Sequence, residues 1–196
     1  MIWLPNTKTV IMHAAKTGGT FVRQAVLAAG LNCEKQLGRH ETADLEGCRA
    51  LYPHMDHAMV FVRNPLGWYQ SYWADRQLAG WGGDLLLGHN CQLDDFGDFI
   101  RCTTLHHPAF LKGYFGRYTK DHVMVGKQEN LVADLLKFLV DVGEEPNASA
   151  VLQLERVNLC ASRPRLAERC EYTPETRKLV AESEQEVFEM FDYPTD

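Results

Sequence analysis

The stretch that organises the chain is Val10-Ile-Met-His-Ala-Ala-Lys-Thr-Gly-Gly-Thr-Phe-Val-Arg23. Its apolar residues 10–12 predict a short buried strand, and helical spacing resumes over residues 21–29. Residues 14–20 join the two, and we call them the glycine loop. Glycines let backbone N–H groups close around a phosphate, and a helix N-terminus adds the positive end of its dipole. Lys16 supplies a full charge, so the stretch predicts a phosphate-binding turn.

The composition is that of an ordinary globular protein. The chain has 196 residues, of which 45% are hydrophobic and 23% are charged. This length suits one well-packed core, so we expect a single domain over residues 1–196. No apolar run reaches the roughly 20 residues that cross a bilayer, and no secretory signal pattern is found. We expect a cytoplasmic protein, or a lumenal one if an N-terminal anchor has been removed.

Cysteine spacing gives no sign of a metal site. The six cysteines form no C-x-x-C pair and lack the spacing of zinc ligands. We expect free thiols in a reducing compartment, although Cys160 and Cys170 could close a small loop in a lumenal protein.

Charge is distributed unevenly along the chain. The formal net charge is -6, which argues against a nucleic-acid-binding protein. Residues 1–41, however, carry five basic and two acidic side chains, a net charge of +3, so the remaining residues sum to -9. A local cationic region in an acidic protein suits a small anionic ligand better than a polyanion.

Strand patterns alternate with helical patterns. The predicted strands are residues 9–13, 32–37, 58–62 and 122–126. The predicted helices are residues 20–29, 43–51, 66–77, 93–103 and 130–142, with a last helix that Thr173 and Pro174 begin. Residues 80–92 and 143–170 are predicted loops. This order predicts an α/β fold: a three-layer, P-loop-like domain whose central, mainly parallel sheet is flanked by helices.

A second polar pattern follows the predicted strand at residues 58–62. The strand runs into Arg63, and Pro65 is placed to begin a helix on which Ser71 lies. Because the carboxyl ends of neighbouring parallel strands form the ligand crevice, we expect Arg63 and Ser71 at the same edge as the glycine loop. A guanidinium fork and a hydroxyl group are suited to a second phosphate.

The sequence lacks the usual signs of a magnesium-dependent NTPase. Lys16 precedes the glycines, whereas in the Walker A pattern the lysine follows them. Such an enzyme also needs a strand that ends in Asp to hold its metal, and here the strand ends in Arg63. We therefore predict a metal-free site for a ligand with an additional anionic group.

These residues resemble those of the sulfotransferases that use 3′-phosphoadenosine 5′-phosphosulfate (PAPS). Residues 16–20 resemble the family's 5′-phosphosulfate loop. Residues 62–65, with Ser71 and Tyr72, resemble its 3′-phosphate motif. Residues 38–43 and 172–193 are similar to the carbohydrate-type branch of that family.

Two positions depart from the family's pattern. Ala15 stands where the family usually has proline. Gly67 and Trp68 stand where an Asp-Arg pair is common, so the role of that pair has no counterpart here.

The resemblance implies an enzyme that transfers a sulfuryl group from PAPS to a hydroxyl acceptor, a carbohydrate or other small molecule, and leaves 3′,5′-adenosine bisphosphate. Lys16 would stabilise charge on the leaving oxygen. The 5′-phosphate would be gripped by Thr17, Gly18, Gly19 and Thr20. Arg63 and Ser71 would hold the 3′-phosphate. Phe21 would pack near the adenine, or else serve as an ordinary core residue of the helix.

The acceptor hydroxyl needs a base, and His40 is the candidate because it follows the second predicted strand. Glu41 and Asp44 are near in sequence and could orient His40 or replace it. Arg163 and Arg165 could add cationic contacts.

Two other functions stay open. A P-loop kinase of unusual motif would bind ATP with Mg²⁺, although Arg63 replaces the expected metal-binding Asp. A nucleotide-binding regulator would keep the glycine loop without acceptor chemistry, so replacing His40 would leave its function intact. The loop could also be a plain strand-to-helix link, but its coincidence with the Arg63–Ser71 pattern would then be accidental.

Overall fold

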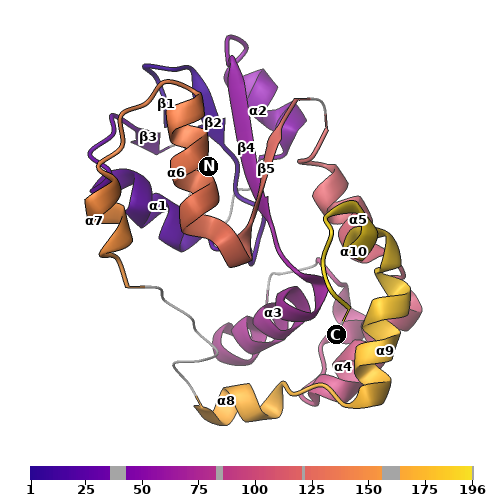
Figure 1. The fold of residues 1–196 in the computed structure, drawn as a ribbon. Coiled ribbons are helices and arrows are strands. Elements are labelled where there is room, and N and C mark those ends of the chain that lie inside the picture. The colour runs from indigo at the N-terminus through magenta and orange to yellow at the C-terminus, as the bar shows by residue number, and fades with distance from the viewer. Residues whose placement is uncertain (36–42, 83–85, 121, 156–163, 196) are drawn as a thin grey trace. The chain divides into compact units, whose positions relative to one another are not determined.

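The computed structural model describes residues 1–35, 43–82, 86–120, 122–155 and 164–195. The chain divides into two compact units, which we describe separately. Unit 1 comprises Met1–Arg63 and Tyr114–Arg156, and unit 2 comprises Asn64–Gly113 and Val157–Asp196. The protein is an α/β protein whose mixed sheet lies in unit 1 and packs against helices (Figure 1).

The sheet has the order β3-β1-β2-β4-β5. Its strands are β1 (Ile2–Leu4), β2 (Thr9–Ile11), β3 (Glu34–Lys35), β4 (His57–Val62) and β5 (Met124–Lys127). β2, β4 and β5 run parallel, whereas β1 is antiparallel to both of its neighbours. The parallel register pairs Val10 with Ala58 and Val62 with Lys127, so these three strands end at one edge.

Helices of unit 1 bury their apolar stripes against this sheet. They are α1 (Gly19–Ala28), α2 (Leu45–Leu51), α6 (Leu131–Asp141) and α7 (Ala148–Leu152), with a short η2 (Gln128–Asn130) before α6. The shared core includes Val22 of α1, Phe61 of β4 and Leu135 of α6. Ile2 and Leu4 join this core, while the alternate residue Trp3 stacks on Tyr52, with ring centroids 4.3 Å apart.

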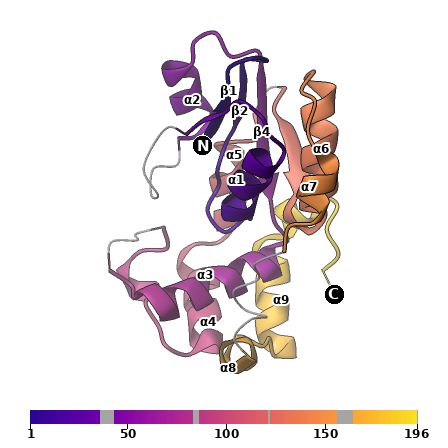
Figure 2. The same ribbon diagram turned by 90° about the vertical axis from the view of Figure 1, so that its left-hand side faces the viewer.

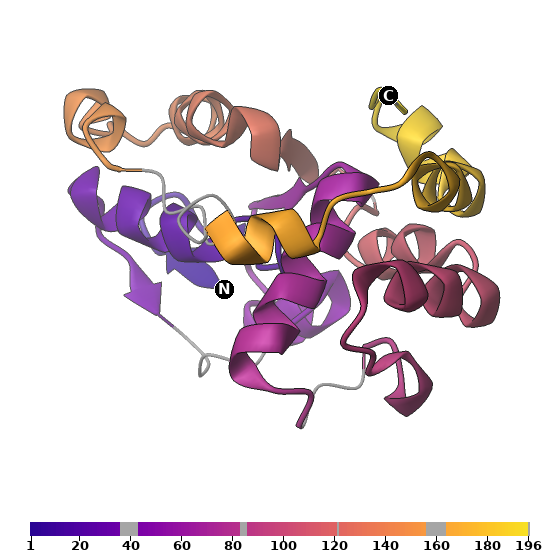
Figure 3. The same cartoon turned by 90° about the horizontal axis from the view of Figure 1, so that it is seen from below.

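Unit 2 is helical. Its elements are α3 (Pro65–Ala79), η1 (His89–Cys91), α4 (Phe96–His106), α8 (Pro164–Arg169), α9 (Pro174–Ser183) and α10 (Gln185–Met190). α5 (Phe110–Gly116) begins in unit 2 and ends in unit 1. The helices α3, α4 and α9 pack together (Figures 2 and 3). The buried aromatic side chains of this unit include Trp68, Tyr69 and Phe99.

The predicted α/β class and the parallel pairing of β2, β4 and β5 are confirmed. The helices α1, α3, α4 and α6 also lie close to their predicted ranges. The prediction was wrong over residues 80–92 and 143–170, where η1, α7 and α8 occur instead of uninterrupted loop. It also missed β1 and α5, which are short, so each offers few residues from which to recognise a period.

Candidate functional site

The glycine loop connects β2 to α1 through two backbone conformations in the left-handed region. Lys16 has φ +66° and Gly18 has φ +90°. Glycine adopts such a φ freely, whereas a residue with a Cβ atom does so at a cost of about 1–2 kcal/mol. A Cβ atom at Gly18 would also lie 2.4 Å from Cδ1 of Leu131. The packing of α6 against the loop therefore requires glycine at position 18.

No side chain of a described residue caps the N-terminus of α1. Its N-cap residue is Gly18, and its first turn has no acidic residue. In contrast, α2, α3, α4 and α9 begin with capping side chains, from Asp44, Asn64, Asp95 and Thr173 respectively. The first N–H groups of a helix have no partner within the helix and favour negative charge. This end of α1 is thus suited to an external anion.

Hydrogen bonds hold the start of the glycine loop. The Thr17 hydroxyl group donates to the Ala14 carbonyl oxygen at 2.8 Å, and Thr17 is buried. The Ala15 N–H donates to the Tyr114 hydroxyl oxygen at 2.6 Å. Because the Thr17 hydroxyl proton is used within the loop, Thr20, exposed at the first turn of α1, is the hydroxyl donor left for a ligand.

His13 lies beneath the glycine loop, against Gly19. Burial, together with the positive charges of the N-terminus, Lys16 and Arg23, lowers the pKa of His13 to about 4. The imidazole is therefore neutral at neutral pH. A neutral ring adds no charge to the glycine loop, and the loop packs closely against it at Gly19.

Arg63 contacts the glycine loop directly. Its Nη1 atom donates to the Lys16 carbonyl oxygen at 3.2 Å. Arg63 reaches the loop because β2 and β4 are parallel neighbours in the sheet. The Met12 N–H continues this pairing past the end of β2 by donating to the Met59 carbonyl oxygen at 2.8 Å. The structure thus brings Lys16 and Arg63 together at one sheet edge, as the sequence predicted.

Sequence reasoning missed Lys127, the last residue of β5. It pairs in register with Val62, directly before Arg63, so basic residues end two neighbouring strands. Its backbone N–H donates to an Asp134 carboxylate oxygen at 2.7 Å. The available signal was the basic residue after an apolar strand, the same signal that identified Arg63.

The other predicted residues are distributed over both units. Phe21 is buried in the core of unit 1, with 8% of its surface exposed, which favours its core role. Ser71 lies on α3 of unit 2 and is half-buried. His40, Glu41 and Arg163 fall outside the described residues, and Arg165 belongs to α8.

Asp44 has a structural role. It caps α2 by accepting the Gly47 N–H at 3.0 Å, and it pairs with Arg117, whose Nη2 atom lies 3.0 Å from Oδ2. The hydrogen bond from Gly47, with Arg117 beside it, lowers the pKa of Asp44. Both effects make Asp44 a poor general base.

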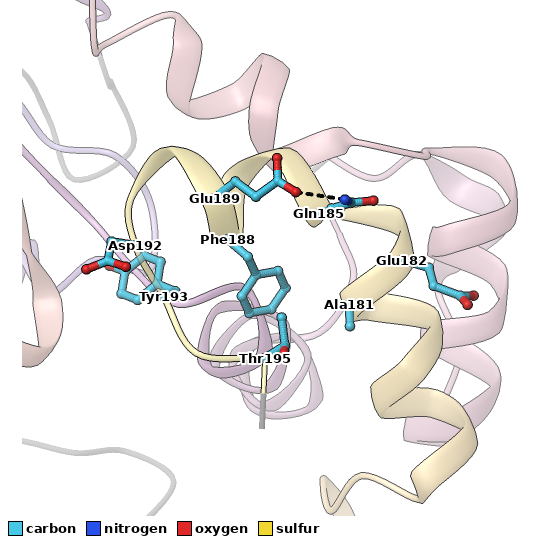
Figure 4. A pocket seen from close by; sticks show the side chains of 8 residues that line it. All are labelled: Ala181, Glu182, Gln185, Phe188, Glu189, Asp192, Tyr193 and Thr195. Carbon is cyan, nitrogen blue, oxygen red and sulfur yellow. Dashed lines mark hydrogen bonds between the residues drawn. The ribbon is translucent and has the colours of Figure 1, made fainter.

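A surface pocket of about 460 Å³ lies on the C-terminal part of unit 2 (Figure 4). It is lined by Ala181, Glu182, Gln185, Phe188, Glu189, Asp192, Tyr193 and Thr195. Gln185 donates to Glu189 at 2.7 Å, one turn further along α10 (Figure 4). None of the predicted site residues that the structure describes lines this pocket, and its three carboxylates do not suit an anionic nucleotide.

Three further observations bear on the function. In the part of the chain that the structure describes, no three His, Cys, Asp or Glu side chains cluster in a way that could hold a metal ion. Among the same residues, no helix has the length and apolar character needed to cross a membrane. The described cysteines are free, and the sulfur atoms of Cys91 and Cys102 lie 3.2 Å apart in a hydrogen bond.

Comparison of the chain with protein-family models, curated proteins and solved structures gives no match.

Proposed function

We propose that the chain is a PAPS-dependent sulfotransferase with a three-layer, P-loop-like core, acting on a hydroxyl group of a carbohydrate or another small molecule. The observation that carries the proposal is the hydrogen bond from Arg63 Nη1 to the Lys16 carbonyl oxygen. Through this bond a second cationic side chain contacts the glycine loop. Arg63 stands at the end of the neighbouring strand, where a Mg²⁺-dependent nucleotide enzyme needs a carboxylate. A donor with phosphate groups at both ends of its ribose suits such a pair of cations.

The residues at the sheet edge suit the 5′-phosphosulfate group. The uncapped N-terminus of α1 offers backbone N–H groups from residues 18–20, and Thr20 offers an exposed hydroxyl group. Lys16 precedes this end of the helix and would place its ammonium group on the bridging oxygen that leaves. Charge grows on that oxygen during sulfuryl transfer, so a cation fixed there lowers the barrier.

Arg63 would bind the 3′-phosphate, the group that distinguishes PAPS from ATP. A guanidinium group makes charge-assisted, bidentate hydrogen bonds to phosphate, which are about twice as strong as neutral ones. Ser71 remains the proposed second ligand of that phosphate. His40 remains the proposed base for the acceptor hydroxyl, because Asp44, one of its alternatives, is engaged with Arg117.

Calorimetric titration with 3′,5′-adenosine bisphosphate, ADP and AMP, in the presence of EDTA, tests the proposal. We expect clear preference for the 3′-phosphorylated nucleotide. Arg63→Ala should weaken its binding by about 10- to 100-fold, because a charged hydrogen bond to phosphate is lost. AMP, which has no 3′-phosphate, should lose less affinity, about three- to tenfold, because only the hydrogen bond from Arg63 to the glycine loop is removed.

Arg49→Ala is the matched control, since Arg49 is an exposed arginine of α2 in the same unit. It should leave all three affinities unchanged. Equal affinity of the wild type for the three nucleotides would rule out the sulfotransferase. Preference for ADP that appears only when Mg²⁺ replaces EDTA would favour the kinase instead.

A further inference from the structure

Tyr114 contacts the glycine loop through its hydroxyl group. The Ala15 N–H donates to this oxygen at 2.6 Å, across 99 positions of sequence. The Tyr114 side chain is buried, with 6% of its surface exposed. We propose that Tyr114 is a positioning residue of the donor site, fixing the backbone before Lys16 so that the ammonium group meets the 5′-phosphosulfate. This inference rests on the proposed function.

The backbone at Lys16 needs support from outside the loop. Its φ of +66° lies in the left-handed region, which residues other than glycine occupy only where the surroundings fix them. The chain is held on both sides of this residue. The Ala15 N–H before it is bound by Tyr114, and the carbonyl group of Lys16 accepts from Arg63. Loss of either contact would free the Lys16 backbone to relax toward its ordinary conformations.

The pairing of Ala15 with Tyr114 has a reason in the sequence. Ala15 stands where the resembled family usually has proline, a residue without an N–H group and with a nearly fixed φ. Alanine at this position has an N–H that needs a partner and a backbone with more freedom. The Tyr114 hydroxyl supplies the partner and removes that freedom.

Tyr114 is itself held firmly. Its ring meets that of Tyr118 edge-on, with centroids 5.7 Å apart. One turn later, the Arg117 guanidinium group donates to the Asp44 carboxylate. The backbone carbonyl oxygen of Arg117 also accepts the Leu45 N–H at 3.3 Å. The segment 114–118 is therefore anchored to the start of α2. Burial raises the pKa of Tyr114 above its ordinary value, so the hydroxyl group stays neutral at every working pH.

The test compares Tyr114→Phe with Tyr52→Phe. Tyr52 has a buried hydroxyl group without a hydrogen-bond partner among the described residues, so its removal controls for the loss of any buried hydroxyl. Two ligands are titrated by calorimetry: 3′,5′-adenosine bisphosphate and 3′-AMP, which lacks the 5′-phosphate. Amide hydrogen exchange at Ala15 is followed by NMR without ligand.

We expect Tyr114→Phe to weaken binding of the bisphosphate about three- to tenfold, the usual effect of losing one hydrogen bond. Binding of 3′-AMP should change by less than about twofold, because the glycine loop faces the 5′ end. Exchange at Ala15 should accelerate. With Ala15→Pro, which removes the donor N–H, Tyr114→Phe should cause no additional loss.

The outcomes separate this inference from the proposed function. Normal wild-type preference for the bisphosphate, with Tyr114→Phe behaving like Tyr52→Phe, would overturn the inference alone. Equal loss of affinity for both ligands would show a general effect on folding and also overturn it. A wild type that does not prefer the 3′-phosphorylated nucleotide would overturn the proposed function and, with it, the donor-site role of Tyr114.

Discussion

At Gly19 the glycine loop passes directly over the imidazole ring of His13. A Cβ atom at this position would lie 2.1 Å from Cδ2 and 2.3 Å from Nε2 of that ring. The requirement for glycine here is spatial, whereas at Gly18 the φ of +90° adds a conformational requirement. Two adjacent glycines thus serve different physical needs.

Gly19→Ala should therefore destabilise the protein by about 1–3 kcal/mol, the usual cost of overpacking a closely packed contact. His13→Ala removes the ring that the new methyl group would strike. In the double variant, the cost of Gly19→Ala should fall by at least about 1 kcal/mol, a coupling expected for residues in direct contact. Urea unfolding of the four proteins in this cycle measures the coupling.

Gly30→Ala provides a comparison for the Gly19→Ala change. A Cβ atom at Gly30 would meet no atom of the described residues within 4 Å, although the φ of Gly30 is +73°. Any cost at Gly30 is therefore conformational and should not depend on His13. Strictly additive effects of Gly19→Ala and His13→Ala on the free energy of unfolding would contradict this prediction. They would show that the His13 ring moves aside for the new methyl group at no energetic cost.

Among the elements, α3, α5, α9 and α10 are joined by one buried carboxylate, Glu184. It lies where α9 ends and α10 begins, with 1% of its surface exposed. It accepts the Tyr69 hydroxyl at 2.7 Å and the Leu111 N–H at 3.1 Å. Burial outweighs these hydrogen bonds and raises the pKa of Glu184 from 4.5 to about 7.

This shift predicts a pH-dependent stability. The folded state binds the Glu184 proton more tightly than the unfolded state does. The contribution of this proton to the free energy of unfolding is therefore fully present at low pH. It is lost as the pH rises from about 4.5 to about 7. Across that interval, the free energy of unfolding of the wild type should fall by up to about 3 kcal/mol relative to Glu184→Gln. Urea unfolding at several pH values measures the difference.

Glu182→Gln is the control for the Glu184→Gln comparison. Glu182 is an exposed carboxylate of α9 that pairs with Lys178 at 3.6 Å. Its replacement should leave the pH dependence of the wild type in place. An equal dependence on pH in Glu184→Gln would show that the buried carboxylate does not titrate in this range.

Local patterns in the sequence were enough to find β2 and β4, which are short apolar runs, and α1 and α3, which have a helical period and a Gly or Pro at their boundaries. They also predicted that Arg63 would meet the glycine loop, since parallel strands end at one edge. Contacts between distant residues could not be found this way. Tyr114 lies 99 positions from Ala15, and Glu184 lies 115 positions from Tyr69. Neither residue belongs to a local motif.

For the molecule as a whole, the charge separates between the two units. Unit 1 carries 12 basic and 12 acidic side chains, whereas unit 2 carries 8 basic and 14 acidic ones. The net charge of -6 is therefore the charge of unit 2. An acidic protein repels a polyanion over about one Debye length, roughly 8 Å at physiological salt.

Under the proposed function, this charge predicts how salt changes the preference between acceptors. Transfer to a neutral oligosaccharide and to a sulfated one of equal length would be compared while the salt concentration is raised about tenfold. The donor is the same in both reactions, so the effect of salt on donor binding cancels in their ratio. Screening should raise the relative rate with the sulfated acceptor about two- to fivefold, because the repulsion weakens. A relative rate that falls with salt would instead reveal a basic acceptor surface, and the net charge would then not govern the choice of acceptor.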